Sequence, residues 1–169
     1  MSLRRIGFNS RVARAARDTD ALVRVVEISR TKCKIHDGTA VHDARPLPAL
    51  EREAPPVVGD WAIAIRDAHG AHWLAARVPP YTQLTRIGPS GERQALVSNV
   101  DFALLVMGLD ANFNLRRLER FIALAKSSGV TPVIVLTKRD LCADVAGRLD
   151  ELADRLPGDL ERSTVPCAP

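Results

Sequence analysis

The chain has 169 residues, of which 46% are apolar, and this is enough for a hydrophobic core and too many for a disordered chain. No apolar run approaches the roughly 18 to 20 residues of a membrane span, so we expect a soluble protein without a membrane partner. Residues 1–88 carry 14 Lys and Arg against 9 Asp and Glu, whereas residues 89–169 carry 10 against 11. The basic character of the first half favours contact of that half with a polyanion.

After an N-terminal extension over residues 1–20, the first half shows short β-type runs separated by turn residues. We expect five strands, at 22–28, 31–35, 61–65, 72–78 and 81–87. The segment 41–57 contains four prolines and is expected to be a connection rather than a central strand. This pattern predicts a small all-β barrel of the OB-fold type over residues 21–88, with an SH3-like barrel as the nearest alternative.

The periodicity changes after the segment Gly88–Gly91, which we interpret as a hinge between two domains. The continuous apolar run at 102–107 is typical of a strand that helices cover on both faces. An amphipathic helix over Leu115–Ser127, with Asn114 as its N-cap, and a second buried strand at 131–136 complete a strand-helix-strand unit. A helix at about 143–156 and the start of a third strand at 163–167 follow. Residues 89–169 are therefore predicted to form a partial α/β domain, and we expect a longer domain of which this is the first part.

The apolar run at 133–136 is followed by a polar tetrapeptide, Thr137-Lys138-Arg139-Asp140. This tetrapeptide lies at the carboxyl end of the expected strand, where ligands of open α/β sheets bind. One aspartate carboxylate can accept two parallel hydrogen bonds from N1–H and the 2-amino group of guanine, and adenine offers no such pair of donors. Asp140 is thus a candidate reader of guanine, and the aliphatic stem of Lys138 could lie along the base. The competing interpretation of Asp140 is an N-cap for the helix that follows.

The predicted barrel carries the candidate contacts to RNA, which are basic side chains and aromatic rings. The basic candidates are Arg24, Lys32, Lys34, Arg45, Arg66, Arg77 and Arg86. Trp61, Trp73 and Tyr81 are stacking or core residues, and the core interpretation is favoured for the two tryptophans. Asn99 and Asp101, which precede the strand at 102–107, are either loop anchors or plain turn residues.

Cysteine and histidine give no sign of a metal site. The three cysteines, Cys33, Cys142 and Cys167, are too few and too scattered for a disulfide framework, which fits a cytoplasmic location. The four histidines match no zinc-ligand spacing, and they are His36, His42, His69 and His72. We therefore expect no bound metal in these residues.

The tetrapeptide Thr137–Asp140, the strand and helix before it, and the segment Gln94–Asp101 together resemble the circularly permuted GTPases of small-subunit assembly, the RsgA or YjeQ type. The same resemblance is carried by Gly59-Asp60-Trp61, Arg86, Asn112–Arg117 and Glu119-Arg120, and it runs from about residue 7 to residue 140. It implies an OB-fold barrel followed by the first part of a P-loop-like GTPase domain in which the guanine-specificity motif precedes the phosphate loop.

The resemblance also implies a function. The full-length family binds GTP or GDP with magnesium and hydrolyses GTP in late maturation of the small ribosomal subunit, with the barrel on its rRNA; a monomer is expected. The 169 residues contain no G-x-x-x-x-G-K-[ST] and no Cys/His zinc domain, so zinc is expected only in a C-terminal domain outside them. We therefore expect this chain alone to bind GDP weakly and to be inactive.

Two other functions stay open at this point. The chain could be a non-enzymatic RNA-binding module or a truncated remnant, in which case the barrel carries its only activity. A permuted GTPase of another assembly family is disfavoured, because those relatives generally lack the N-terminal barrel.

Overall fold

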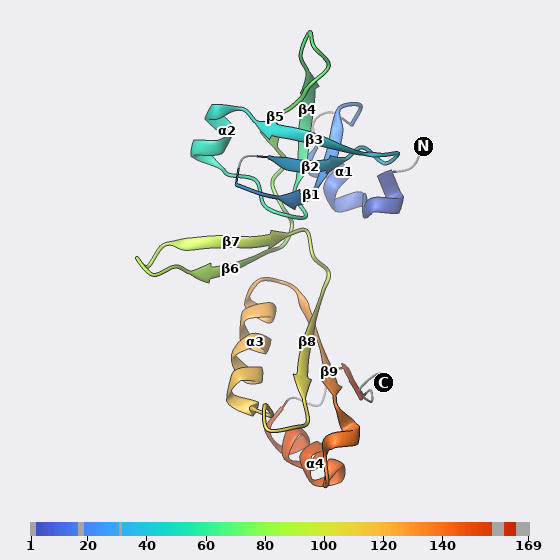
Figure 1. The fold of residues 1–169 in the computed structure, drawn as a ribbon, viewed down its shortest axis with the longest axis vertical. Coiled ribbons are helices and arrows are strands. Elements are labelled where there is room, and N and C mark those ends of the chain that lie inside the picture. The colour runs from blue at the N-terminus through green and yellow to red at the C-terminus, as the bar shows by residue number, and fades with distance from the viewer. Residues whose placement is uncertain (1–2, 17–18, 31, 157–160, 165–169) are drawn as a thin grey trace. The chain divides into compact units, whose positions relative to one another are not determined.

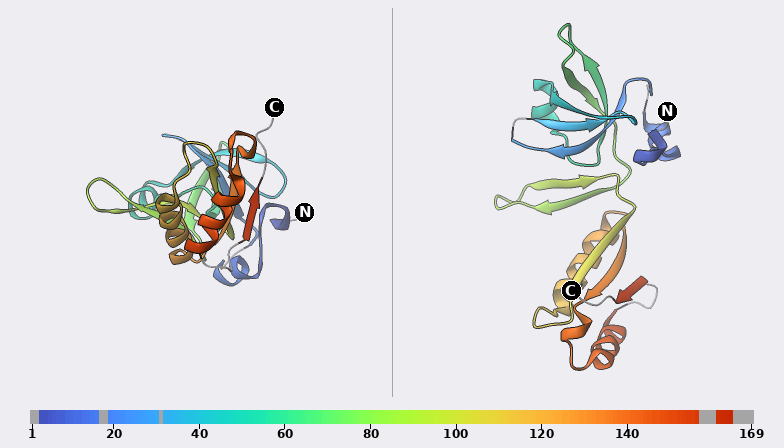
Figure 2. Two further views of the ribbon diagram at one scale, coloured as in Figure 1. Left: turned by 90° about the horizontal axis from the view of Figure 1, so that it is seen from below. Right: turned by 45° about the vertical axis from the view of Figure 1, so that its right-hand side comes forward.

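The computed structural model describes residues 3–16, 19–30, 32–156 and 161–164, and the chain divides into two compact units, residues 1–100 and 101–169 (Figures 1 and 2). The first unit contains the barrel and a two-stranded hairpin, and the second contains a parallel sheet with two α-helices. No helix in the described part of the chain has the length and apolar character needed to cross a bilayer.

The barrel of the first unit is closed and has five strands, in the order β1-β2-β3-β5-β4. The strands are β1 (Leu22–Ile28), β2 (Cys33–His36), β3 (Val41–Pro46), β4 (Trp61–Arg66) and β5 (His72–Arg77). Only the β3–β5 pair is parallel, and β1 closes the barrel against β4. The short helix α2 (Pro48–Glu53) lies between β3 and β4 in sequence. This order confirms the OB-fold that the sequence predicts.

Two apolar clusters hold the first unit together. The barrel interior is filled by alternate residues of the strands, Val23, Val25, Ile35 and Leu74 among them. The second cluster surrounds Trp61, which is 1% exposed, and brings in the N-terminal elements η1 (Leu3–Ile6) and α1 (Ser10–Ala15). Residues 3–16 are therefore packed on the barrel.

The third barrel strand differs from the expectation that 41–57 is a connection. Residues 41–46 form β3, which pairs with β2 on one side and with β5 on the other. Only one side chain of this strand, Ala44, is fully buried, so the segment lacks the alternating apolar pattern that predicts a strand. Pro46 is tolerated because it is the last residue of the strand.

The run at 81–87, which the sequence predicted as the fifth barrel strand, lies outside the barrel. Its residues Gln83–Ile87 form β6, which pairs with β7 (Arg93–Ser98) in an antiparallel hairpin. The segment Gly88–Gly91, which the sequence suggested as a hinge between domains, is the turn of this hairpin, with Gly91 in the left-handed region at φ +85°. A β-bridge between Val58 and Val97 joins the hairpin to the loop before β4.

The second unit has the strand-helix-strand order expected from the sequence. Its elements are β8 (Phe102–Gly108), α3 (Leu115–Ser127), β9 (Thr131–Thr137), η2 (Arg139–Leu141), α4 (Val145–Arg155) and β10 (Glu161–Thr164), and the three strands are parallel in the order β10-β9-β8. Asn114 caps α3 by accepting a hydrogen bond from the backbone N–H of Arg117 at 2.9 Å. The expected strand 163–167 overlaps β10, and its last three residues lie outside the described residues.

Both helices pack on the same face of this sheet. Leu118 and Ile122 of α3 and Leu152 of α4 share one core with Ile134 and Leu136 of β9. On the opposite face the side chains of Phe102, Leu104 and Val106 are 61%, 65% and 63% exposed. Among the described residues, therefore, helices cover one face of β8 and not both as its apolar sequence predicted.

Candidate functional site

The tetrapeptide Thr137–Asp140 lies at the carboxyl edge of the parallel sheet. Thr137 is the last residue of β9, and its register partner is Gly108, the last residue of β8. The backbone N–H of Leu109 donates to the carbonyl of Thr137 at 2.9 Å, so the two strand ends stay joined past the sheet. This edge is where α/β proteins bind ligands.

Lys138 has an unusual backbone conformation, and its side chain forms an ion pair with Asp110. Its φ of +59° is in the left-handed region, which non-glycine residues seldom adopt. Its ammonium Nζ lies 2.5 Å from Oδ2 of Asp110, and the hydrogen bond from Lys138 holds the pKa of that carboxyl below its usual range. The ion pair thus fixes the end of the Lys138 side chain beside the carboxyl end of β8.

Asp110 is a residue of the candidate site that the sequence reasoning missed. It is 28 positions from Lys138 in the chain, and no motif links the two. A signal existed, however, because Asp110 comes two residues after the end of the apolar strand β8, and the carboxyl ends of parallel neighbouring strands meet at one edge of a sheet.

Asp140 lies in the short turn η2, where its side chain is exposed. The interpretation of Asp140 as the cap of the next helix does not apply, because Asp144 caps α4 by accepting from the N–H of Gly147 at 2.8 Å. A hollow of about 560 Å³ lies at the same edge of the sheet, lined by residues that include Asp110, Leu141 and Arg148. The carboxylate of Asp140 thus lies in the turn that directly follows β9 at this edge of the sheet.

Two of the seven basic candidates bind groups inside the first unit. Arg77 forms a two-pronged ion pair with the fully buried Asp60, with Nε 2.7 Å from Oδ2 and Nη2 2.8 Å from Oδ1. Arg24 donates to the carbonyl oxygens of Ile6 and Asn99. These two side chains hold the first unit together, so we do not propose them as contacts to RNA.

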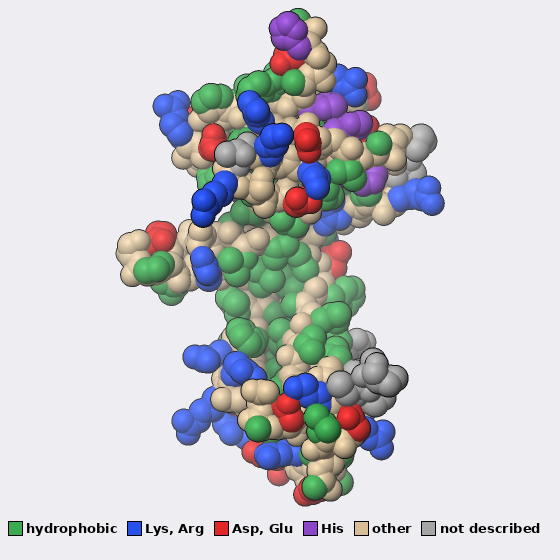
Figure 3. All heavy atoms as spheres, viewed as in Figure 1, with side chains coloured by type: hydrophobic (Ala, Val, Ile, Leu, Met, Phe, Trp, Pro, Cys, Tyr) green, Lys and Arg blue, Asp and Glu red, His purple; other side chains and the backbone are tan. Residues whose placement is uncertain are grey.

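The other five basic side chains are spread over the outer surface of the first unit. Lys34 pairs with Glu27 at 2.8 Å, Arg66 donates to His72 at 2.9 Å, and Arg86 donates to Gln94 on the hairpin at 2.9 Å. Lys32 and Arg45 line surface hollows beside Trp73. Figure 3 shows Lys and Arg side chains interspersed with acidic ones over β1, β2 and β3. The basic candidates thus do not form a single cluster.

The two tryptophans have different environments. Trp61 is in the core, as predicted, but Trp73 is half-buried on the outer surface of the barrel. The prediction of Trp73 as a core residue is wrong because its neighbour Leu74 is the inward residue of β5, and alternate residues of a strand point to opposite faces.

Asn99 is a structural anchor of the first unit rather than a plain turn residue. Its side chain is buried, donates to the carbonyl of Gly59 at 3.0 Å and accepts from the N–H of Tyr81 at 3.2 Å. Its φ of +55° places it in the left-handed region. These bonds tie the strand end of the hairpin to the loop before β4.

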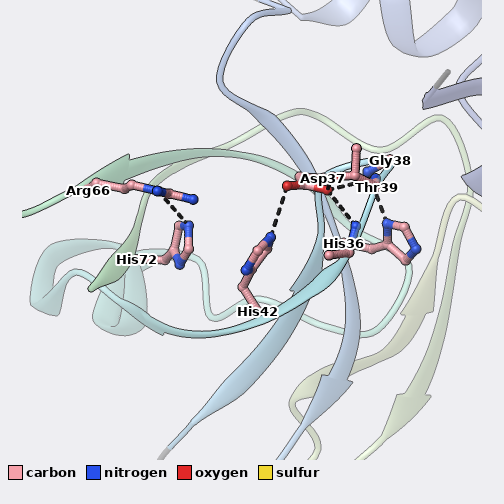
Figure 4. A network of polar contacts seen from close by, with 8 residues as sticks. His36, Asp37, Gly38, Thr39, His42, Arg66 and His72 are labelled. Atoms are coloured by element: carbon pink, nitrogen blue, oxygen red, sulfur yellow. Dashed lines mark hydrogen bonds and ion pairs between the residues drawn. The ribbon is translucent and has the colours of Figure 1, made fainter. Parts of the chain in front are cut away.

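Three of the four histidines lie in a polar network at one end of the barrel (Figure 4). His42 is 2.9 Å from Oδ2 of Asp37, whose pKa is held well below its usual range, chiefly by the hydrogen bond from the hydroxyl of Thr39. The rings of His42 and His72 are 4.6 Å apart, and His36 accepts from the N–H of Gly38 at 2.9 Å. In the part of the chain that the structure describes, no group of three or more His, Cys, Asp or Glu is placed to hold a metal ion.

The network makes the stability of the first unit depend on pH. Burial, followed by the charges of Arg66 and His42, lowers the pKa of His72 in the folded chain. As the pH falls through about 6.5, the unfolded chain therefore takes up a proton that folded His72 resists, and the free energy of unfolding decreases. We expect the urea midpoint, followed by tryptophan fluorescence, to fall between pH 7.5 and 5.5, and His72→Gln to flatten that slope.

His69→Gln is the matched control, because His69 is exposed in the turn between β4 and β5. This variant should keep the slope of the unaltered chain. A slope that is equally steep in the His72→Gln variant would contradict the assignment to His72.

The chain is similar to one protein family, to curated proteins of known name and to solved structures. The model of the family RsgA GTPase matches residues 78–158. The "Small ribosomal subunit biogenesis GTPase RsgA" of Xylella fastidiosa (strain M23) is 37% identical over 139 residues, which are 78% of this chain and 40% of that protein. The protein of the same name from Opitutus terrae is 44% identical over 107 residues, 57% of this chain and 29% of that protein. The chain thus spans about 40% or less of the length of these relatives.

Solved structures show the same fold at low sequence identity. YjeQ from Thermotoga maritima has a TM-score of 0.68 at 18% identity, with 86% of this chain and 51% of that chain covered. YloQ, described as a circularly permuted GTPase, has a TM-score of 0.62 at 18% identity, with 89% and 54% covered.

Proposed function

We propose, from the premise that this chain is of the RsgA/YjeQ type, that it is the RNA-docking and guanine-reading portion of a GTPase of small ribosomal subunit biogenesis. The observation that carries the proposal is the loop Thr137–Asp140 at the carboxyl edge of the sheet, with the ammonium of Lys138 fixed by Asp110. Relatives that bear this function in their names match most of the chain.

In this proposal each residue of the loop has a part. Asp140 accepts hydrogen bonds from N1–H and the 2-amino group of guanine, and the stem of Lys138 covers one face of the base. Thr137 joins the loop to β8, since its hydroxyl lies 3.5 Å from the carbonyl of Met107. Arg139 is exposed beside Asp140, where it can meet the ribose or solvent.

Phosphate binding and hydrolysis are proposed to need residues outside these 169. The sequence has no phosphate-binding loop of the G-x-x-x-x-G-K-[ST] form, and within the described residues no group of three or more His, Cys, Asp or Glu is placed to hold a metal ion. These residues therefore fit the base of the guanine nucleotide that the family uses. Its phosphates and the magnesium would be held by other residues. We infer that this chain alone binds nucleotide weakly and does not hydrolyse it.

The base-reading role of Asp140 is tested by Asp140→Asn. An asparagine amide can donate to the 2-oxo group of xanthine, and the carboxylate cannot, so the variant should prefer XDP to GDP by roughly 10- to 100-fold. The measurement is a titration with each nucleotide, followed by the amide signals of residues 137–141 in NMR spectra.

Asp150→Asn is the control, since Asp150 is exposed on α4 and carries the same change of charge. That variant should retain the preference of the unaltered chain for GDP. An unchanged preference for GDP in the Asp140→Asn variant would remove the role given to Asp140.

The barrel is proposed to dock on rRNA of the small subunit through phosphate contacts. The exposed cations of the first unit include Lys32, Arg45 and Arg66 of the barrel and Arg86 of the hairpin. Four phosphate contacts to single-stranded RNA predict that the logarithm of the affinity falls with the logarithm of the salt concentration with a slope of about −3. The measurement is fluorescence anisotropy of a labelled oligonucleotide at several salt concentrations. An affinity that does not vary with salt would rule out docking through phosphates.

A further inference from the structure

Two hollows on the outer surface of the barrel share three lining residues. One hollow has a volume of about 390 Å³ and the other about 300 Å³. Lys32, Arg45 and Trp73 line both of them. The indole of Trp73 and two cations thus lie between two neighbouring depressions, each of a size that suits a small-molecule moiety.

The sheet register explains why these side chains meet. Arg45 of β3 and Trp73 of β5 are register partners in a parallel pair, and Ile65 of β4 is the partner of Trp73 on its other side. The preceding residue of β3, Ala44, and the following residue of β5, Leu74, are buried in the barrel. Arg45 and Trp73 therefore point outward side by side.

The indole of Trp73 is fixed before any ligand arrives. Its Nε1–H donates to Oδ2 of Asp67 at 3.0 Å, and the same aspartate accepts from the N–H groups of His69 and Ala71 at 2.9 Å. These hydrogen bonds hold the pKa of Asp67 below its usual range, the bond from Trp73 being the largest cause. A side chain held in this way loses little conformational freedom when a ring stacks on it.

The two cations are available for an anionic ligand. Within the described residues, no ion pair or side-chain hydrogen bond occupies Lys32 or Arg45, and both are exposed. Asp43 also lines the larger hollow. The smaller hollow is lined mainly by apolar residues, among them Ile28, Pro46 and Pro56.

We propose that Trp73 is a stacking platform for unpaired bases of RNA, with adjacent nucleotides in the two hollows and the phosphate between them on Lys32 and Arg45. The inference rests on the proposed docking of the barrel on rRNA and names the form of RNA that the barrel selects, which is a single strand. Aromatic stacking suits every base, so the site distinguishes unpaired from paired RNA and not one base from another.

The test compares a 12-nucleotide oligocytidylate with a duplex RNA of similar charge, using the unaltered chain. Trp61 is buried in the core, so quenching of tryptophan emission by RNA reports on Trp73. We expect the oligocytidylate to quench this emission and the duplex to leave it unchanged. Trp73→Leu should weaken binding of the labelled oligocytidylate by roughly 5- to 150-fold, and Trp73→Phe, which keeps a ring, should retain most of the affinity.

Charge variants test the cations separately. Lys32→Ala and Arg45→Ala should each reduce the salt slope for the single strand by about 0.7. Ile87→Ala, an exposed apolar residue of the hairpin, and Arg120→Ala, an exposed cation of α3, are the matched controls and should leave affinity and slope unchanged.

The outcomes separate this inference from the function on which it rests. If the unaltered chain binds neither RNA, the docking function itself fails. If it binds the oligocytidylate while Trp73→Leu binds equally well, or if the emission of Trp73 does not change, the stacking site is overturned and docking stands. Equal quenching by the duplex would overturn the selection of single strands.

Discussion

Asp60→Ala is expected to lower the free energy of unfolding of the first unit by about 3 to 5 kcal/mol. Asp60 is fully buried and holds both the guanidinium of Arg77 and the N–H of Val57, the latter at 2.7 Å. Its removal leaves a cation whose side chain is only 16% exposed without its partner. Because both tryptophans lie in the first unit, loss of native tryptophan emission on heating measures this unit, and the midpoint should fall by at least roughly 12 °C.

Two further variants give this expectation its controls. In the double variant Asp60→Ala with Arg77→Leu no charge is left unpaired, and much of the lost stability should return. Glu27→Ala removes the exposed pair with Lys34 and should change the midpoint little. A midpoint for Asp60→Ala close to that of Glu27→Ala would show that the buried pair does not hold the first unit together.

Gly59→Ala is expected to destabilise the same unit by about 3 kcal/mol or more. Gly59 has a φ of +90°, and a Cβ added there would lie 2.0 Å from the backbone carbonyl oxygen of Ser98. That oxygen belongs to the end of β7 and cannot rotate away as a flexible side chain could. The substitution must therefore separate the hairpin from the loop before β4, where Asn99 also binds.

Gly70→Ala is the matched control for Gly59→Ala. Gly70 has a similar φ of +82°, but a Cβ there would have no heavy atom within 4 Å. Its cost should be limited to backbone strain of roughly 1 to 2 kcal/mol. Equal thermal midpoints for the two variants would mean that contact with Ser98 adds nothing and that strain alone decides.

The parts of the fold that the sequence predicts well are those with regular apolar spacing. The helix α3 has the predicted bounds, Leu115–Ser127, because its apolar stripe, Asn114 cap and terminal glycine agree. The strand β3 was missed because it buries one small side chain, Ala44, and because its place in the barrel depends on pairing with β5, whose partner residues lie 28 positions further along the chain. Long-range pairing of this kind leaves no periodic mark in the segment itself.

The candidate site was predictable in its motif and not in its supports. The tetrapeptide Thr137–Asp140 is contiguous and follows an apolar strand, so its position at the sheet edge follows from the sequence. The partner of Lys138, Asp110, becomes evident only when β8 and β9 are placed side by side. In the same way, Arg24 and Arg77 resemble surface cations in the sequence, and only the tertiary structure reveals their internal partners.

The apolar sequence of β8 predicts its secondary structure and not its surroundings. Its uninterrupted apolar character predicted helices on both faces, and the described residues supply them on one. Leu104 and Val106 are large apolar side chains that this face leaves exposed to solvent. Sequence pattern thus identified the strand but not what lies against each of its faces.

The most direct test of the account is an NMR titration of the isotopically labelled chain with GDP and, separately, with ADP. Base contacts alone predict weak binding, with a dissociation constant of about 1 mM or weaker. We expect GDP to shift the amide signals of residues 138–141 and of Asp110, and ADP at the same concentration to leave them in place. Equal shifts with both nucleotides, or no shift of these signals at saturating GDP, would contradict the assignment of this loop as a reader of guanine.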